Sequence, residues 1–118
     1  MEESILESIK QMLGIYPEDK AFDLELTSHI NNAISDLIHV GEGTDWEYRI
    51  YDASNKWGEF VSSESAIAQA KQYVYCKVHL NFDAPSNSFV VDSISKSKDE
   101  ALWRFYEMLD QERINGRD

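Results

Sequence analysis

One uninterrupted segment, residues 64–82, limits the folds that are open to this chain. It contains no glycine or proline, and it is apolar on nearly all sides when wound as a helix. Its last ten residues also alternate apolar and polar side chains in the manner of a strand, so periodicity alone leaves both structures open. We predict a helix across the whole segment, because residues 64–72 begin one and nothing breaks it before Asp83. A helix that is apolar nearly all round belongs at the centre of a bundle or at an interface between subunits.

Glycine and proline divide the rest of the chain into further helices. Gly14 suits the end of the first helix, and Pro17 breaks the chain after it. Gly41 ends the second, and Pro85 suits the first turn of the last. We therefore predict an all-α fold, a small bundle of four to five helices with a long central helix. The expected elements are helices at 3–13, from between 18 and 24 to 40, at 64–82 and at 88–112, one or two helical turns at 56–61, an irregular loop at 41–56 and frayed residues from 114.

The chain is the right size for one domain with one core. It has 118 residues, of which 42% are apolar, and we assign residues 1–118 to a single domain. Aromatic residues make up 12% of the chain, more than a disordered chain would carry. The predicted core consists of side chains on the apolar stripes: Ile30, Leu37, Trp57, Val74, Val78, Phe82, Trp103 and Phe105.

The sequence offers no arrangement of residues that would support catalysis or hold a metal ion. No two of His29, His39 and His79 are three or four residues apart, so none share a helical face as metal ligands would. Cys76 is the single cysteine, so it has no disulfide partner in the chain, and its apolar surroundings favour a buried, inert thiol. There is no glycine-rich phosphate loop and no nucleophile elbow. We expect no enzymatic activity and no cofactor.

The sequence also carries no sign of export or membrane insertion. No apolar run approaches 18 residues, the length that a membrane-spanning helix needs. The first residues are acidic, whereas a signal peptide begins with positive charge. We therefore expect a soluble protein that is kept inside the producing cell.

The charge of the chain is strongly negative and unevenly placed. Acidic residues number 22 and basic residues 11, and residues 1–60 account for −9 of the net charge of −11. Such a surface repels phosphate backbones, because affinity for DNA comes largely from cations that release counterions. The charge either serves solubility alone or forms a surface that faces a basic partner or avoids sticking to nucleic acid.

Aromatic residues in the glycine-bounded loop form the candidate interface. Trp46, Tyr48 and Tyr51 lie there among charged residues, with Arg49 between them. Tyr, Trp and Arg are the residue types that dominate the binding energy of protein interfaces. Local packing is the more common role of an aromatic residue in a loop. If the chain binds a protein partner, we predict that the partner binds at this loop.

An ordered set of short motifs resembles the small head-tail connector proteins of tailed bacteriophages, also called head-completion or adaptor proteins. The set covers residues 5–105, and its centre is Phe82-Asp83-Ala84-Pro85-Ser86, between a tyrosine-rich helix and Glu100-x-x-Trp103-Arg104. Where this family has Phe-Asp-Pro-Pro, Ala84 replaces the first proline. The remaining motifs are an Ile-x-x-x-Ile-x-x-x-Leu-Gly helix ending at Gly14, Phe22-Asp23, His29-Ile30-Asn31, Trp57 with Phe60, and Tyr73-Val74-Tyr75-Cys76-Lys77-Val78.

The resemblance implies an all-helical structural protein without catalysis. Sister copies would form a twelvefold ring beneath the portal protein after DNA packaging, extend the DNA channel and bind the next neck or tail-completion protein. DNA would be only passing cargo, which suits an acidic lumen, and contacts between unlike faces would close the ring. The protein would be made in the host cytoplasm and reside in the neck of the virion, with no membrane partner.

Two other functions compete with this one. An acidic DNA mimic that occupies a DNA-binding enzyme would need acids spaced like phosphates on an exposed stripe. A small enzyme is disfavoured, because the sequence shows no catalytic constellation.

Overall fold

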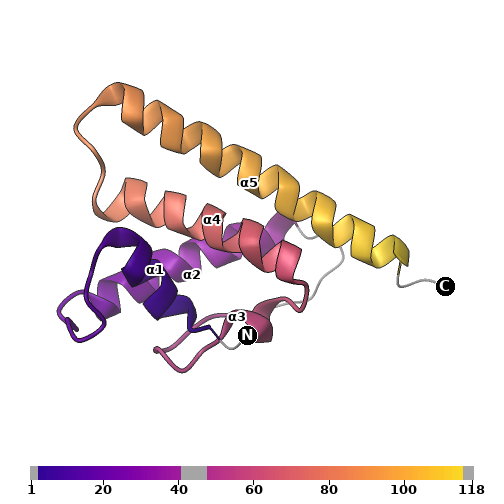
Figure 1. Cartoon of the computed structure of the whole chain (residues 1–118), viewed down its shortest axis with the longest axis horizontal. Coiled ribbons are helices and arrows are strands. Elements are labelled where there is room, and N and C mark those ends of the chain that lie inside the picture. Colours follow the sequence, from indigo (N-terminus) through magenta and orange to yellow (C-terminus); the bar gives the residue numbers. More distant parts are fainter. Residues whose placement is uncertain (1–2, 41–47, 116–118) are drawn as a thin grey trace.

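The computed structural model describes residues 3–40 and 48–115, and within these ranges the chain is helical and forms no β-sheet (Figure 1). The helices are α1 (Ile5–Leu13), α2 (Asp23–Val40), α3 (Trp57–Phe60), α4 (Glu64–Phe82) and α5 (Ser88–Asn115). The prediction of an all-α bundle is confirmed. The last helix runs three residues further than predicted.

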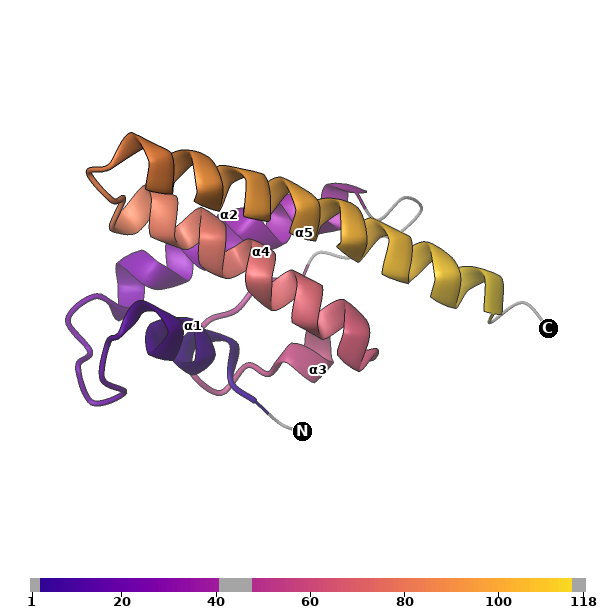
Figure 2. The same ribbon diagram turned by 45° about the horizontal axis from the view of Figure 1, so that its top comes forward.

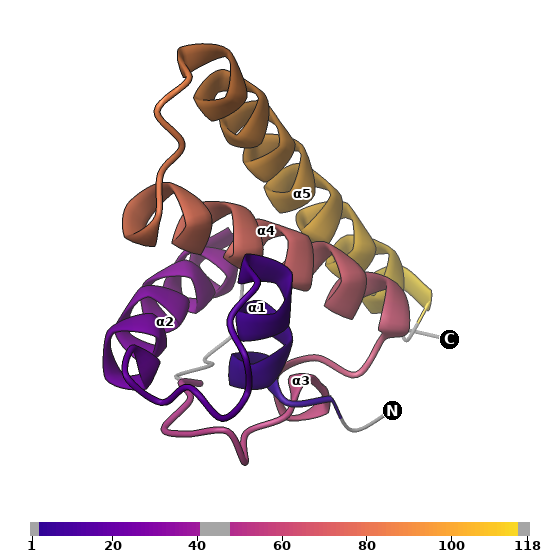
Figure 3. The same cartoon turned by 60° about the vertical axis from the view of Figure 1, so that its left-hand side comes forward.

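α4 is the centre of the bundle. It packs along α5 and against α2 and α1; Figure 3 shows it between α2 and α5, and Figure 2 shows it crossing in front of α2. The hydroxyl of Ser63 accepts a hydrogen bond from the amide of Ala66 and so caps the start of the helix. The helix prediction for 64–82 is confirmed. α4 is apolar on nearly all sides because helices of the same chain, α1, α2 and α5, pack around it. Its buried residues are Ala66, Ala70, Tyr73, Val74, Cys76 and Val78.

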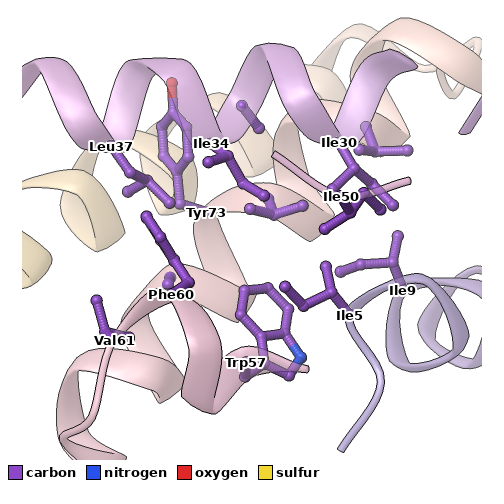
Figure 4. Close-up of a cluster of buried hydrophobic side chains, with 14 of the residues drawn as sticks. Ile5, Ile9, Ile30, Ile34, Leu37, Ile50, Trp57, Phe60, Val61 and Tyr73 are labelled. Atoms are coloured by element: carbon purple, nitrogen blue, oxygen red, sulfur yellow. The ribbon is translucent and has the colours of Figure 1, made fainter. Parts of the chain in front are cut away.

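The start of the described chain is tied to the segment that leads into α3. Ser4 and Lys56 form an isolated antiparallel bridge, and the amide of Trp57 donates to the carbonyl of Glu3 at 3.1 Å. The indole of Trp57 donates to the hydroxyl of Ser8 at 2.9 Å. Only 1% of Trp57 is exposed, and its ring lies beside the isoleucines of α1 in Figure 4. These contacts hold α1 against α3.

A buried lysine fixes the connection between α1 and α2. Lys10 is 1% exposed, and its Nζ donates to the carbonyl oxygens of Pro17, at 3.2 Å, and Asp19, at 2.7 Å. The same nitrogen forms an ion pair with Asp23 at 2.8 Å. The connection therefore wraps around the ammonium group, and α2 begins at Asp23, within the predicted range of 18–24.

Most of the predicted core lies inside the bundle, and Figure 4 shows its centre. Phe82 is only partly buried; its ring packs edge-on against Phe22 with centroids 5.4 Å apart. The predicted residues with 1% exposure or less are Ile30, Leu37, Trp57, Val74, Val78 and Phe105.

The prediction that Trp103 belongs to the core is wrong. This side chain is 60% exposed, whereas Ala101 and Phe105 on the same helix are buried. Trp103 lies two residues from each, and two residues turn an α-helix by about 200°. It therefore projects away from the face of α5 that carries Ala101 and Phe105, and most of its surface is in solvent.

A polar cluster at the edge of the core also joins α2 to α4. The hydroxyl of Tyr73 donates to Asp36 at 2.7 Å, and Lys77 forms an ion pair with the same carboxylate. Burial alone would raise the pKa of Asp36, but the hydrogen bonds from Lys77 and Tyr73 outweigh burial, and the pKa is lowered. Burial and the hydrogen bond to Asp36 raise the pKa of Tyr73, which keeps its phenol protonated as a donor.

Acidification is expected to weaken this link. The pKa of Asp36 is lowered by folding, so its stabilising contribution is present above the ordinary aspartate value of about 3.9 and is lost as the pH falls through the lower, folded value. In Asp36→Asn that contribution is missing at every pH. We therefore expect the wild type to melt at a higher temperature than the variant near neutral pH, and the difference to shrink below about pH 4. Thermal melts across this pH range measure the effect, and a difference that does not change with pH would contradict it.

Candidate interaction surfaces

Residues 48–51 form a short segment that lies against α2, with alternate side chains buried and exposed. Tyr48 is partly buried and Ile50 fully buried, whereas Arg49 and Tyr51 are exposed. The side-chain amide of Asn31 on α2 holds the segment in place: it donates to the carbonyl of Ile50 at 3.0 Å and accepts from the amide of Ile50 at 2.8 Å. Arg49 and Tyr51 are therefore presented to solvent from one anchored segment.

Tyr48, another predicted interface residue, mainly packs within the chain. Its ring stacks on Phe60 with centroids 5.5 Å apart, and its hydroxyl donates to Glu59 at 2.9 Å. Burial and the neighbouring carboxylate of Glu59 raise the pKa of Tyr48. Trp46, the remaining predicted interface residue, lies outside the described residues.

A hydrogen-bonded turn fixes Tyr51 in its exposed position. The side-chain oxygen of Asn55 accepts hydrogen bonds from the amides of Tyr51, at 2.7 Å, and Asp52, at 3.3 Å. Asp52 in turn accepts from the amide and the hydroxyl of Ser54, and these hydrogen bonds lower the pKa of Asp52. Tyr51 is 76% exposed, so a large ring stands in solvent on an internally bonded turn.

Leu24, at the start of α2, is 87% exposed and lines the same surface groove as Tyr51. The two side chains line an open groove of about 550 Å³, which Lys20 and Thr27 also line. This surface, with Leu24 and Tyr51 at its centre, is called the Leu24–Tyr51 patch below. Leu24 was not among the interface residues predicted from the sequence. The sequence signal that could have identified Leu24 is its position on α2. It lies about 200° around the helix axis from the buried Leu26 and is therefore an apolar residue outside the stripe that faces the core.

A second exposed apolar surface lies where α5 crosses the end of α2. The ring of Trp103 stacks on that of Tyr106 with centroids 5.9 Å apart and an interplanar angle of 29°. The rings line an open groove of about 580 Å³, called the Trp103 groove below. This groove was not predicted from the sequence, because Trp103 was expected in the core. The groove is lined by His39, Val40, Asp99, Leu102, Trp103 and Tyr106.

Replacing Trp103 by alanine is expected to leave the free energy of unfolding nearly unchanged. The side chain is 60% exposed, and alanine has the higher helix propensity. Substitutions at such surface positions usually change the free energy of unfolding by less than about 0.5 kcal/mol. Urea unfolding followed by circular dichroism measures the effect. A loss of about 3 kcal/mol or more, typical of a buried tryptophan, would show that the ring is covered in solution.

The described residues contain no group of three His, Cys, Asp or Glu side chains that could hold a metal ion. Cys76 is buried on α4, and burial raises the pKa of its thiol. Within 3–40 and 48–115, no helix combines the length and the apolar character needed to cross a membrane. The Leu24–Tyr51 patch and the Trp103 groove are exposed surfaces that contain large apolar side chains, and such surfaces mark sites of protein–protein interaction.

Comparison with known proteins gives a match over nearly the whole chain. A family model described as phage connector protein matches residues 5–112. This span takes in α1 to α4 and most of α5, and with them the Leu24–Tyr51 patch and the Trp103 groove. No curated protein and no solved structure matches the chain.

Proposed function

The chain belongs to the phage connector protein family, and from this membership we propose that its copies form a twelvefold ring beneath the portal protein. The family makes it a structural head-tail connector protein of the virion. In the proposed assembly the ring is added after DNA packaging, extends the DNA channel and receives the next neck or tail-completion protein. The observation that carries the proposal is the family match over residues 5–112 of the 118.

The packing of the chain suits a structural building block. Side chains from α1, α2, α3 and α4 meet in one close-packed core (Figure 4), and α5 adds Ala101 and Phe105 to it. Such a core gives each copy a fixed shape, because packed interiors resist deformation. Fixed shape is what a ring subunit needs, since errors in the angle between neighbours would add up around the ring.

The charge of the chain supports a channel through which DNA slides. With a net charge of −11, a ring of copies presents many carboxylates. Cationic contacts would bind the DNA backbone by releasing its counterions and would hold it in place. Carboxylates repel the backbone instead, so an acidic lumen lets DNA pass.

The same charge influences assembly. Copies that each carry −11 repel one another at a distance, so free chains associate weakly unless the contacting surfaces compensate. We therefore expect the isolated chain to be monomeric at low concentration and to form rings on a portal or at high concentration. Higher salt weakens the repulsion by screening and should promote association.

The test adds the purified chain to DNA-filled, portal-bearing heads and images the necks by electron cryomicroscopy. We expect an added annulus of twelve copies directly below the portal. Heads with the same portal but without the added chain provide the control. The proposal is overturned if the chain does not bind these heads or lies elsewhere on the particle. Salt-sensitive inhibition of a nuclease by a chain that is absent from the neck would favour an acidic DNA mimic instead.

A further inference from the structure

Cations flank the Leu24–Tyr51 patch in the most acidic part of the chain. Residues 1–60 contain 13 acidic side chains and only four basic ones. Lys20 lines the groove beside Leu24, and Arg49 is exposed two residues before Tyr51. Two carboxylates also line the groove: Asp23 is paired with the buried Lys10, whereas Asp52 accepts hydrogen bonds from Ser54 and keeps its negative charge. The patch therefore combines an apolar centre with two cations at its edge, Lys20 and Arg49, against one carboxylate without a cationic partner among the described residues.

Carboxylates flank the Trp103 groove. Asp99 and Glu107 lie four residues before and after Trp103, about one helical turn away on the same face of α5, and both are exposed. Asp99 forms an ion pair with Lys98 at 3.1 Å, but its side chain remains 73% exposed, and such surface pairs are weak. The groove therefore combines an apolar, aromatic centre with a negatively charged edge.

We propose that the Leu24–Tyr51 patch of one copy docks into the Trp103 groove of the next copy. The inference rests on the proposed ring, and it names the two faces that would join neighbouring subunits. Because the copies repel one another as whole molecules, they associate where the cationic edge of one meets the anionic edge of the other. The rings of Tyr51, Trp103 and Tyr106 supply the aromatic anchors that carry most of the energy of an interface.

The two surfaces are placed for a head-to-tail contact. Leu24 lies in the first turn of α2 and His39 in its last, 15 residues apart, which corresponds to about 22 Å along the helix axis. Figure 1 shows α2 running from the connection after α1 to the point where α5 crosses it. Each copy thus offers one patch and one groove, at opposite ends of a rigid element. A contact between unlike faces can be repeated from copy to copy until it closes a ring.

Two matched variants test the pairing of these faces. Leu24→Glu places a charge in the patch, and Trp103→Glu places one in the groove. Both positions are exposed and helical, and glutamate is a good helix former, so both variants are expected to keep the wild-type helix content and melting temperature. Each variant alone is expected to self-associate at least about a hundredfold more weakly than the wild type, in sedimentation velocity at concentrations where the wild type forms rings. A mixture of the two is expected to form heterodimers and nothing larger, because only one intact patch and one intact groove can meet.

A charge exchange tests the electrostatic part separately. Arg49→Glu and Glu107→Lys are each expected to weaken association about tenfold or more, because each brings like charges together across the contact. The double variant R49E/E107K restores opposite charges and is expected to recover most of that loss. The control is R49E/D92K, which has the same net charge as the rescued variant but places the lysine about three helical turns away from Trp103. Recovery by the control as well would show that net charge, and not this contact, sets the affinity.

The failure of this contact and the failure of the ring give different results. If the wild type forms rings, alone or on portal-bearing heads, and either glutamate variant does so equally well, the inference is overturned and the ring stands. Normal rings that no longer bind the portal would assign the surface to a different partner and also overturn it. Dimers formed by one variant alone would show a contact between like faces. If the wild type forms no ring under either condition, the proposed function fails and the inference with it.

Discussion

Replacing Lys10 by methionine is expected to lower the free energy of unfolding by about 3 kcal/mol, since removing one partner of a buried ion pair typically costs about 3–5 kcal/mol. Methionine keeps most of the apolar stem of lysine, so the packing around α1 is largely preserved. What is lost is the ammonium group that serves Asp23 and the carbonyls of Pro17 and Asp19. Because Asp23 is 26% exposed, water can take over part of the lost hydrogen bonding, which places the effect at the lower end of the range.

Urea unfolding of the full chain measures this effect, with Lys20→Met as the matched control. Lys20 is exposed, so the same change there is expected to alter the free energy of unfolding by less than about 0.5 kcal/mol. The loss of stability in Asp23→Asn is expected to lie between the losses in Lys10→Met and Lys20→Met, because Lys10 keeps its carbonyl partners. Equal stability of Lys10→Met and the wild type would show that the lysine does not hold the α1–α2 connection in solution.

The other large effect is expected at Trp57. Trp57→Ala is expected to lower the free energy of unfolding by about 3–5 kcal/mol, the usual range for deleting a fully buried aromatic ring. Trp57 is 1% exposed and joins α3 to α1 through packing and through its hydrogen bond to Ser8. The same change at Trp103, which is 60% exposed, is the control, because substitution and residue type are identical and only burial differs.

Trp57→Phe separates the hydrogen bond of the indole from its packing. Phenylalanine retains most of the buried ring but cannot donate to the hydroxyl of Ser8. We expect this variant to lose about 1–2 kcal/mol, the typical cost of a lost hydrogen bond together with a small reduction in buried volume. Urea unfolding measures both variants. A Trp57→Ala variant no less stable than Trp103→Ala would contradict the buried position of the indole.

The helices could be predicted because their signals are local. Ser63 is a good cap, no glycine or proline interrupts the following residues, and the predicted segment agrees with α4 at both ends. The orientation of α5 about its own axis is not a local property. Trp103 and Phe105 look equally apolar in sequence, and only the contact with the bundle shows which of them faces inward. Burial of Lys10 was equally hidden, because it depends on a connection that folds back over the side chain.

The candidate surfaces could also be predicted only in part, because only some of their residues carry a local sequence signal. Arg49 and Tyr51 were identified from residue type and from their place in a loop, and the structure presents both to solvent. Leu24 was not identified, because its neighbour Tyr51 is brought to it by the fold and not by sequence. The Trp103 groove joins residues of two helices that are about sixty positions apart in the chain, so no spacing rule could have found it.

The hydrogen bond between the indole of Trp57 and Ser8 spans 49 residues of sequence, and this separation has a kinetic consequence. The pairing of α4 with α5 closes only a short connection, which costs little chain entropy, so this hairpin is expected to form early during folding. Docking of α1 against α3 must wait until a much longer loop has closed. Substitutions that loosen this α1–α3 contact are therefore expected to speed unfolding and to leave the refolding rate almost unaltered, as is typical of contacts made after the transition state.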